Sequence, residues 1–366
     1  MSRPDIALFA ATSGHSGVDR VFTNLASQFL DQGLRVDQLV VRDHGPNMPL
    51  DHQGFRRIEL GPSSVYPSLP AVVRYLRRER PRAMLSDKDR VNRVAVIARA
   101  MAGGSTRLAV RIGSTISHNL ARRSPLQRFG QRISSRYLAT RADTIVVPSI
   151  GAADDLARFA GIPRNFIQVA PNPFDFESMR QRAAADPGHP WFEDGRGPVI
   201  LGAGELSARK DFATLVRAFH RLPDDLHARL IILGRGRKRE ALEALTRELN
   251  SEDKVALPGF TDNPFPYLRR ADLFVLSSTN EGFGNVLVEA MALGTPVVST
   301  DCPSGPREVL QGGRFGTLVP VGDDAAMAAA MAHTLREPPL PEHLAEAVRP
   351  YDIVTSALRY REILGL

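Results

Sequence analysis

Short apolar runs alternate with amphipathic segments of helical length along this chain, and this alternation restricts the possible folds more than any other feature. The first run, Ile6–Ala10, passes through a turn-rich loop into Val18–Leu30, whose apolar residues recur at the spacing of one helix face. Another apolar run, Val36–Val41, follows shortly afterwards. Strands that alternate with helices form parallel sheets with helices on both faces, so the pattern predicts an open α/β sheet.

The alternation is interrupted once and then resumes. Residues 170–175 contain two prolines, which make this segment extended and stiff because proline restricts the residue before it. The next stretch, 178–197, is polar and carries several prolines and glycines, and strands and helices alternate again from Val199 to Ser299. We therefore predict a second doubly wound sheet and a domain boundary in the interrupted region.

The predicted organisation is two Rossmann-like domains followed by a terminal helix. A chain of 366 residues exceeds the usual size of one hydrophobic core, which supports the division. We place the first domain at 1–175, the second at 176–348, and at 349–366 a C-terminal helix that packs back on the first domain. Ligands of open parallel sheets bind at the carboxyl ends of the strands, so we expect an active site in a cleft between the domains.

Charged residues are distributed unequally between the two halves. Residues 1–185 hold 27 Lys and Arg against 15 Asp and Glu, a net charge of +12, whereas residues 186–366 hold 20 against 25, a net charge of −5. A general use of arginine in place of lysine does not explain this asymmetry. We expect an anionic partner for the first half, and we favour anionic lipid over nucleic acid because few aromatic residues accompany the arginines.

The cysteine content and the hydropathy pattern bear on the compartment. Cys302 is the only cysteine, which excludes an intramolecular disulfide and a cysteine zinc site and fits a reducing compartment. The first residues do not resemble a secretory signal, and there is no run of about 20 apolar residues that could span a bilayer. We expect a cytoplasmic protein in peripheral contact with the inner face of the cell membrane.

A glycine-containing loop with two adjacent cations opens the second domain. Gly202 and Gly204 follow a strand, and Arg209 and Lys210 stand just before a helix. Helix amino termini bind phosphate through free N–H groups, and Arg and Lys add charge-assisted hydrogen bonds. The loop is therefore a candidate phosphate site, although a solvated surface pair is the plain alternative and the spacing is not that of a Walker loop.

A second element contains two glutamates separated by seven residues, Glu281 and Glu289, across a turn from strand to helix. Carboxylates accept two hydrogen bonds from sugar or ribose hydroxyls, and Gly282 and Gly284 leave backbone N–H groups free to bind an anion. The alternative is a glutamate that only stabilises the start of a helix through the helix dipole.

These elements together resemble the family 4 glycosyltransferases, which are retaining enzymes with the GT-B fold. The resemblance covers essentially the whole chain, and in the first half Gly14–Gly17 looks like the glycine loop of the acceptor domain and Asn172-Pro173 like the interdomain junction. The motifs of the second half that carry it are Gly202–Lys210, Leu233–Gly236, Leu257–Phe260, Glu281–Glu289, Gly294–Val298 and, typical of one bacterial branch, Ser299–Glu308.

The resemblance implies roles for particular residues. Arg209 and Lys210 match the pair that binds the donor diphosphate and steadies the leaving nucleoside diphosphate, Glu281 matches the glutamate at the transferred sugar, and Glu289 the one at the ribose hydroxyls. Negative charge grows on the diphosphate as the glycosidic bond breaks, so fixed cations there stabilise the transition state. The implied donor site comprises Gly14, Gly17, Gly204, Arg209, Lys210, Gly234, Gly259, Phe260, Gly282, Phe283, Gly284, Asn285, Val286 and Glu289.

The sequence departs from the family pattern in the first domain. Many relatives carry a histidine where this chain has Gly113, and we take His118 as a candidate substitute in catalysis. Asp87-Lys88-Asp89 is a D-x-D string of the kind that binds metal in other transferases, but it lies in the acceptor half. The Arg-Lys pair makes a metal unnecessary, so we predict no metal and no cofactor.

The predicted activity is the retaining transfer of a hexose or N-acetylhexosamine from a nucleotide-sugar, with UDP as the expected nucleotide. The acceptor is a glycan or lipid-linked molecule of a bacterial cell-surface polysaccharide or lipopolysaccharide. We do not assign Glu281 as a covalent nucleophile, because the family is thought to react on one face of the sugar. A GT-B epimerase, a non-catalytic sugar-nucleotide binder and a nucleic-acid binder are the alternatives; a dehydrogenase is disfavoured because no G-x-G-x-x-G follows the first strand.

Overall fold

A computed structural model describes residues 3–12, 14, 16–48, 51–120 and 123–366, apart from the side chains of 118 and 119. The chain divides into two compact units. Unit 1 consists of Met1–Phe174 together with Tyr351–Leu366, and unit 2 consists of Asp175–Pro350. In the described part of the chain, no helix is both long enough and apolar enough to cross a membrane.

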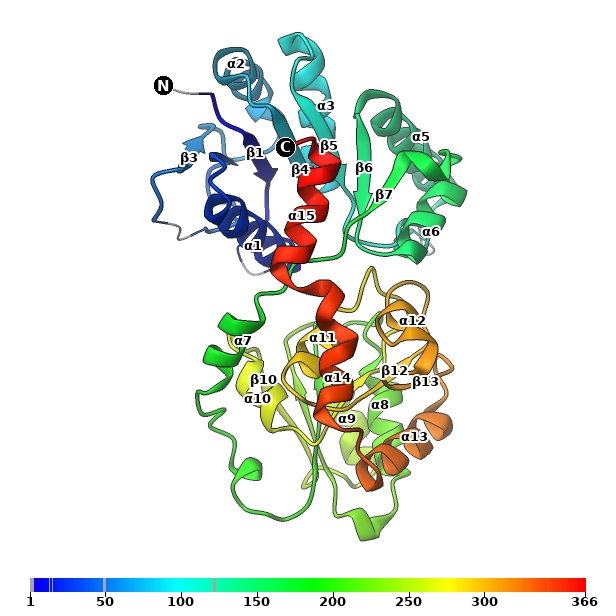
Figure 1. The fold of residues 1–366 in the computed structure, drawn as a ribbon. Coiled ribbons are helices and arrows are strands. Elements are labelled where there is room, and N and C mark those ends of the chain that lie inside the picture. The colour runs from blue at the N-terminus through cyan, green and yellow to red at the C-terminus, as the bar shows by residue number, and fades with distance from the viewer. Residues whose placement is uncertain (1–2, 13, 15, 49–50, 121–122) are drawn as a thin grey trace. The chain divides into compact units, whose positions relative to one another are not determined.

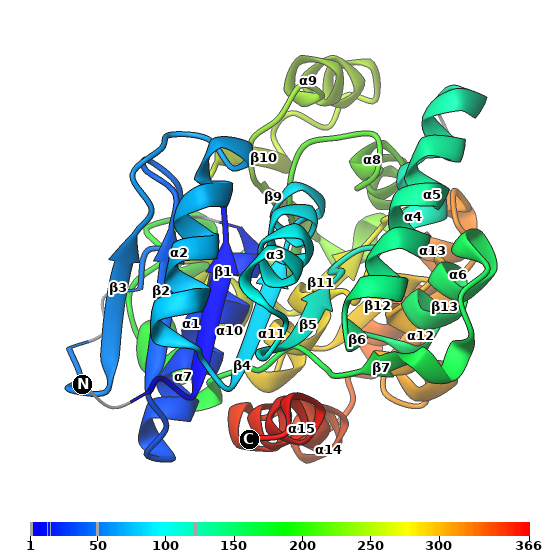
Figure 2. The same cartoon turned by 90° about the horizontal axis from the view of Figure 1, so that it is seen from above.

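Unit 1 is built on a sheet of seven described strands that all run parallel, in the order β3-β2-β1-β4-β5-β6-β7 (Figures 1 and 2). The central strands are fully buried, in keeping with their continuous apolar sequence. The order reverses between β1 and β4, so the loops after these two strands meet at a topological switch point. The strands are β1 Ile6–Ala10, β2 Val36–Val40, β3 Phe55–Glu59, β4 Ala83–Asp87, β5 Arg107–Arg111, β6 Thr144–Val147 and β7 Ile167–Val169.

Helices cover both faces of this sheet. One face packs against α1, whose Phe22 and Phe29 are fully buried, and against the C-terminal helix α15, whose Tyr360 is also fully buried. The opposite face packs against α2, α3 and α6. The helices of unit 1 are α1 Gly17–Asp31, α2 Leu69–Glu79, α3 Asp89–Ala102, α4 Ile116–Asn119, α5 Pro125–Arg141, α6 Ile150–Ala160 and α15 Ile353–Leu364.

Unit 2 is built on a parallel sheet of six described strands in the order β10-β9-β8-β11-β12-β13, which reverses between β8 and β11. Its strands are β8 Val199–Ala203, β9 Arg229–Leu233, β10 Val255–Gly259, β11 Leu273–Leu276, β12 Val297–Thr300 and β13 Thr317–Val319. Its helices are α7 Phe176–Ala183, α8 Phe212–His220, α9 Arg239–Glu248, α10 Phe265–Arg270, α11 Asn285–Ala292, α12 Pro306–Val309, α13 Asp324–Arg336 and α14 Pro341–Val348.

The predicted fold class of two doubly wound parallel α/β domains is confirmed, although some elements differ from the expectation. Strand β3 was missed because it is an edge strand whose sequence contains two arginines and only two apolar residues. Part of the polar stretch 178–197 belongs to helix α7, which begins with a side-chain cap from Asp175 to the backbone of Ser178.

The chain passes between the units at two places that lie side by side. The backbone N–H of Phe174 donates to the carbonyl of Tyr351 over 3.0 Å, and the N–H of Ile353 donates to the carbonyl of Phe174 over 3.0 Å. Helix α15 begins directly after this contact with a cap from Asp352. The C-terminal helix therefore belongs to the core of unit 1 although it follows unit 2 in the sequence.

Candidate functional site

Glycines permit the close approach of two loops at the carboxyl ends of β8 and β9. Gly204 has a φ of +153°, and a Cβ atom there would lie 2.7 Å from Cε of Lys210. A Cβ on Gly234 would lie only 1.8 Å from the carbonyl oxygen of Gly204. Any larger residue at Gly234 would push the loops apart, so the two glycines are required by this backbone geometry.

Three of the residues proposed for catalysis are in direct contact. Lys210 Nζ donates to Glu281 Oε1 over 2.6 Å, and Arg209 Nη1 donates to Glu281 Oε2 over 3.0 Å. The hydroxyl of Ser278 also donates to Glu281 Oε1, over 2.7 Å. Arg209 and Lys210 follow β8 and Glu281 follows β11, so the cluster forms at the switch point where these two strands are neighbours.

The main chain of the cation pair is held by the segment that follows β11. The hydroxyl of Ser277 donates to the carbonyl of Lys210 over 2.7 Å, and the backbone N–H of Thr279 donates to the carbonyl of Arg209 over 2.8 Å. These bonds fix the two loops against each other independently of the charged groups. The backbone therefore positions the two residues, and the bonds to Glu281 orient their charged side chains.

Burial and charge act in opposite directions on Glu281. Burial raises the pKa of its carboxyl, but the charges of Lys210 and Arg209 and the hydrogen bonds from Lys210 and Ser278 outweigh burial, so the pKa lies below its usual value. The carboxylate is thus an anion with both oxygens engaged. Nearby, burial and the charge of Glu281 raise the pKa of the Cys302 thiol to about 12, which keeps that thiol protonated.

The remainder of the glutamate motif forms a tight turn into α11. Gly284 has a φ of +88° and precedes the helix, and Glu289 in the helix is 2% exposed. Phe283 is buried, and its carbonyl would lie 2.1 Å from a Cβ on Gly305, so the chain from β12 passes directly over this turn. Three residues of the motif are half-buried: Gly282, Asn285 and Val286.

The loops after β9 and β10 add a cationic and aromatic edge. The guanidinium of Arg235 lies 4.7 Å from the ring centre of Phe260, which is 48% exposed. Gly259 has a φ of +102°, and its carbonyl accepts from the backbone N–H of Gly234 over 2.8 Å. Arg235 belongs to the motif Leu233–Gly236 but is not among the predicted donor residues, although its place between two glycines was a usable signal.

In unit 1, the loop after β1 is organised around the buried carboxylate of Asp19. The backbone N–H and the hydroxyl of Ser16 donate to Asp19 Oδ2 over 2.6 and 2.5 Å, and the hydroxyl of Thr12 donates to its other oxygen. Gly14 has a φ of +86°, and Gly17 is the first residue of α1. These bonds fix the amino terminus of α1, while Ser13 and His15 lie outside the described residues.

Gly113 and His118 both follow strand β5. His118 belongs to α4, and its side chain lies outside the described part of the structure. Gly113 is exposed, and a Cβ there would lie 2.8 Å from Nη1 of Arg111. A side chain at 113 would therefore press against a fully buried guanidinium, which accounts physically for the glycine at this position.

The D-x-D string makes protein contacts in this structure. Asp87 pairs with Arg111, and Asp89 pairs with Arg93 over 2.6 Å. Among the described side chains, no group of three or more His, Cys, Asp or Glu residues is arranged to hold a metal ion.

Arg111 is the centre of a buried polar network in unit 1. Its guanidinium donates to Asp87 and to the side-chain oxygen of Asn172, and its Nε donates to the hydroxyl of Tyr360 over 3.0 Å. Burial raises the pKa of the Tyr360 hydroxyl, which therefore stays neutral beside the cation. The network joins two strands, the segment before the boundary and helix α15, which are far apart in the sequence.

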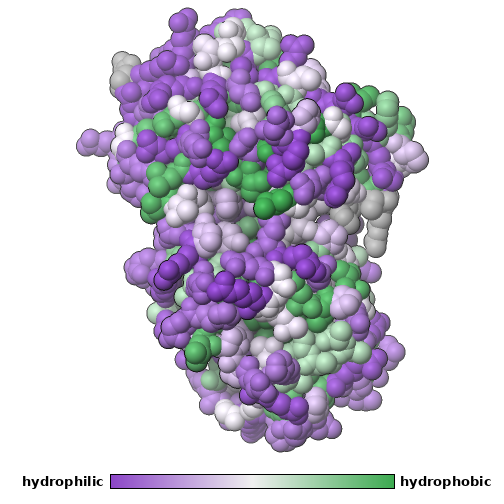
Figure 3. Space-filling model, turned by 45° about the vertical axis from the view of Figure 1, so that its right-hand side comes forward, coloured by the Kyte–Doolittle hydropathy of each residue, from purple (hydrophilic) through white to green (hydrophobic). Residues whose placement is uncertain are grey.

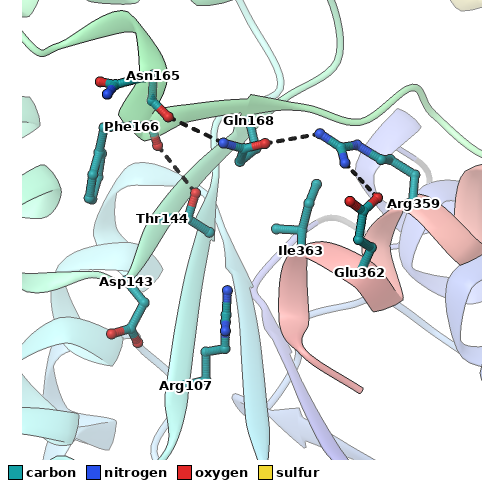
Figure 4. Close-up of a pocket in the computed structure, with 9 residues that line it drawn as sticks. All are labelled: Arg107, Asp143, Thr144, Asn165, Phe166, Gln168, Arg359, Glu362 and Ile363. Carbon is teal, nitrogen blue, oxygen red and sulfur yellow. Dashed lines mark hydrogen bonds and ion pairs between the residues drawn. The ribbon is translucent and has the colours of Figure 1, made fainter.

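A polar pocket of about 310 Å³ lies at the opposite edge of the unit 1 sheet, beside α15 (Figure 4). Gln168 Oε1 accepts from Arg359 Nη2 over 2.9 Å, and Arg359 Nη1 donates to Glu362 over 2.6 Å, so these polar groups satisfy one another. The pocket is formed at the amino ends of β5, β6 and β7, away from the switch point. We assign it no function.

Two glycosyltransferase family models match this chain, one in each half. A model described as a glycosyl transferase 4-like domain matches residues 16–173, and a model described as glycosyl transferases group 1 matches residues 197–337. Together these matches cover most of the chain.

Two curated relatives match part of the chain. The N-acetylgalactosamine-N,N'-diacetylbacillosaminyl-diphospho-undecaprenol 4-alpha-N-acetylgalactosaminyltransferase of Campylobacter jejuni is 35% identical over 239 residues, which cover 65% of this chain and 63% of that protein. The lipopolysaccharide core biosynthesis glycosyltransferase LpsE of Rhizobium meliloti is 38% identical over 149 residues, which cover 41% of this chain and 43% of that protein. The alignment therefore spans less than two thirds of either relative.

Solved structures share the fold over the whole chain. HepE of Anabaena, solved in complex with UDP, has a TM-score of 0.82 at 19% identity, and 99% of each chain is covered. The apo form of the lipopolysaccharide outer core galactosyltransferase WaaB has a TM-score of 0.74 at 19% identity, with 98% of this chain and 99% of that one covered.

Proposed function

We propose a transferase function for this chain, which belongs to the glycosyl transferases of group 1. It moves a sugar from a nucleotide-sugar to an acceptor of a bacterial cell-surface glycan. The observation that carries this proposal is the contact of Arg209, Lys210 and Glu281 at the switch point of unit 2. Relatives named as transferases of lipid-linked and lipopolysaccharide core sugars support a lipid-linked or glycan acceptor of this kind.

The cation pair is the proposed diphosphate site. Lys210 carries three ammonium donors and Arg209 five guanidinium donors, so each retains donors beyond its bond to Glu281. A bound diphosphate would use these remaining donors, and as the sugar leaves, the growing charge on the phosphate would strengthen the same bonds. Glu281 then keeps both cations in place before the donor arrives and faces the transferred sugar afterwards.

The remaining donor contacts are proposed from the resemblance of the motifs to those of the family. We place the ribose hydroxyls at Glu289, the phosphates and sugar at the backbone of residues 282–286, and the nucleoside at the edge formed by Gly234, Gly259 and Phe260. Gly14 and Gly17 of unit 1 are proposed to let the amino terminus of α1 approach the diphosphate when the donor is bound. His118 remains a proposed catalytic residue.

Substitution of the cluster tests the site. Lys210→Ala and Glu281→Ala are each expected to lower turnover by at least ~100-fold, the scale of one lost transition-state contact. Lys254→Ala, at an exposed lysine just before the amino end of β10, serves as the control, because it removes the same charged group away from the carboxyl ends of the strands. Turnover close to the native value in both cluster variants would contradict the assignment.

The nucleotide is proposed to be UDP, which the HepE structure contains. A thermal-shift panel of UDP-, GDP- and ADP-sugars tests this, because a ligand that binds only the folded state raises the melting temperature. A shift with UDP-sugars alone is expected. Consumption of the donor without any acceptor, giving an epimerised nucleotide-sugar, would instead identify an epimerase.

The proposed reaction is retaining and requires no metal or cofactor. Arg209 and Lys210 would supply the charge that a divalent cation supplies elsewhere, and the engaged carboxylate of Glu281 is poorly placed to act as a nucleophile. NMR should show that the product has the same anomeric configuration as the donor, and EDTA should leave the rate unchanged. Inversion, or loss of activity restored by Mg²⁺, would contradict this part of the proposal.

We also propose that the protein is cytoplasmic and contacts the inner face of the cell membrane peripherally, with an anionic lipid-linked acceptor as the partner of its basic half. The net charge of +12 over residues 1–185 supports an anionic surface. We propose no nucleic-acid partner.

A further inference from the structure

Helix α5, Pro125–Arg141, turns most of its large apolar side chains away from the protein. Leu126, Phe129, Ile133 and Tyr137 are 79%, 60%, 52% and 39% exposed. Only Ser135 and Leu138 are buried along the helix. A surface helix normally directs its apolar face toward the core, so this arrangement calls for a partner that covers the outer face.

The exposed apolar residues form one continuous stripe, which we name the α5 stripe. The successive spacings of three, four and four residues place Leu126, Phe129, Ile133 and Tyr137 within an arc of roughly 80° on the helix. The stripe therefore runs along most of the helix length, and does not consist of isolated apolar residues of the kind found on every surface.

Polar contacts hold the opposite side of α5 on unit 1. The side-chain amide of Gln131 donates to Asp89 over 3.1 Å, and Nε of Arg93 donates to the hydroxyl of Ser134 over 2.9 Å. Both partners belong to α3, and Leu138 packs in the core of unit 1. The helix is thus fixed with its apolar stripe facing outward.

A row of arginines accompanies the stripe. Arg128, Arg132 and Arg136 are exposed and succeed one another every four residues, so they lie on one line beside the apolar arc. The sequence from 120 to 142 contains no acidic residue. Figure 3 shows hydrophobic and hydrophilic residues next to each other on the side of unit 1 that carries α5 in Figure 1.

We infer that α5 docks unit 1 on a bilayer that contains anionic phospholipid. The α5 stripe enters the boundary between headgroups and acyl chains, and Arg128, Arg132 and Arg136 bind headgroup phosphates. An apolar face bordered by cations is the pattern of a helix that lies in the plane of a membrane interface. A second copy of the chain fits less well, because a two-fold contact through the stripe brings like-charged arginine rows together.

This inference refines the peripheral membrane contact that is part of the proposed function. It rests on the proposed function only for the biological purpose of docking. It locates the contact on α5, and the docking itself needs neither donor nor transfer. Membrane binding and sugar transfer can therefore be measured separately.

Co-sedimentation with vesicles of phosphatidylcholine and 30% phosphatidylglycerol tests the stripe. The triple variant Leu126→Ser/Phe129→Ser/Ile133→Ser should partition at least ~10-fold more weakly than the native protein, because apolar burial in the interface is lost. The matched control, Val354→Ser/Leu358→Ser, changes similarly exposed apolar residues of α15 and should bind as the native protein does. Native binding by the triple variant would overturn the proposal.

The arginine row has a different signature. Arg128→Gln/Arg132→Gln/Arg136→Gln should abolish the preference for vesicles with phosphatidylglycerol over pure phosphatidylcholine, and should reduce the dependence of binding on salt. The triple serine variant of the α5 stripe, called the serine variant below, should instead keep the preference for phosphatidylglycerol and lose the salt-resistant part of binding. Equal lipid preference in the native protein and the glutamine variant would contradict the assignment of the row.

Insertion depth gives an independent readout. In Phe129→Trp, emission from the new indole should be quenched by phospholipids brominated on the acyl chain, whereas native Trp191, in unit 2, and the control Val354→Trp should not be quenched. Absence of quenching in Phe129→Trp would overturn insertion.

Sedimentation velocity tests whether a second copy of the chain covers the stripe instead. If the native protein is a dimer, and the serine variant is a monomer that still binds vesicles as the native protein does, a second copy covers the stripe and the proposal is overturned.

A final measurement separates this inference from the proposed function. The serine variant should keep the thermal shift given by the donor nucleotide and the transfer of sugar to a short water-soluble acceptor. If the native protein binds vesicles through α5 but transfers no sugar, the proposed function fails and the docking helix stands. If the native protein transfers sugar while the serine variant binds vesicles normally, the docking helix fails and the proposed function stands.

Discussion

At the residue scale, the most informative observation is that one buried carboxylate joins two adjacent cations. Glu281 accepts from Lys210 and Arg209, and its burial keeps water away from these bonds. Removal of one partner from such a cluster leaves a buried charge without compensation, which costs more than the pair contributes. The proposed diphosphate site is therefore also a local source of stability.

The stability contribution of Glu281 depends on pH in a defined direction. Its folded pKa lies below the usual value of a glutamate carboxyl, so the stabilisation is present above that usual value and is lost as the pH falls through the folded pKa. The free energy of unfolding should therefore differ most between the native protein and Glu281→Gln near neutral pH, and the difference should shrink in acid. Urea titrations at several pH values measure it, and a difference that grows in acid would contradict the ion-pair account.

A second residue-scale prediction concerns Gly113. A Cβ at this position meets Nη1 of Arg111, which is held by Asp87, Asn172 and Tyr360 and cannot move aside freely. Gly113→Ala should lower the free energy of unfolding by about 1–3 kcal/mol, the usual cost of overpacking a tight site. Gly130→Ala is the control, because no atom lies within 4 Å of a Cβ there. Equal melting temperatures for the two variants would contradict the prediction.

At the scale of elements, the terminal helix α15 is as much a part of unit 1 as any helix that precedes it in the sequence. Tyr360, Ile363 and Leu364 pack in the same core as α1, and Tyr360 accepts from Arg111. The helix also begins beside Phe174, at the point where the chain leaves unit 1. Unit 1 is therefore complete only when the chain has returned from unit 2.

Tyr360→Phe tests how far α15 depends on the polar network. The change keeps the ring and leaves the Nε of Arg111 without its acceptor, so it should cost about 1–3 kcal/mol, the penalty for an unsatisfied buried donor. Thermal unfolding measures it against Tyr137→Phe, whose ring lies in an exposed position on α5. A loss no larger than in that control would show that the hydroxyl is not structural.

At the scale of the whole molecule, the two units differ in how the chain builds them. Unit 2 is one continuous segment, Asp175–Pro350, and contains Arg209, Lys210 and Glu281, whereas unit 1 is assembled from two separate segments. The charge follows the same division, with a basic first half and a mildly acidic second half. Local cations can bind a diphosphate in an acidic unit because Coulomb interactions between exposed charges are screened beyond about 10 Å at moderate salt.

This division predicts the behaviour of fragments. Residues 175–350 alone should fold and show a thermal shift with UDP, because the cation cluster is contained in them. Residues 1–174 alone should fail to fold stably because they lack α15, and joining them to 351–366 through a flexible linker should restore a cooperative transition. A folded 1–174 fragment with native stability would contradict the place given to α15 in the core.

The sequence by itself determined the two alternating α/β patterns, the break near residue 170 and the chemistry of the glycine loop and the paired glutamates. These features are local, because helix and strand periodicity and turn residues act over a few positions. The residue types proposed to bind a diphosphate could therefore be named in advance, while their geometry could not.

Only the tertiary structure decided which of these residues meet. Lys210 and Glu281 are 71 positions apart and pair because the strand order places β11 beside β8, and Arg111 meets Tyr360 because the last helix returns to unit 1. The outward orientation of the α5 stripe was equally unpredictable from the sequence. Periodicity identifies an apolar stripe but not which side of the helix packs on the protein. Contacts of this kind depend on global packing, which acts between residues that are distant in the chain.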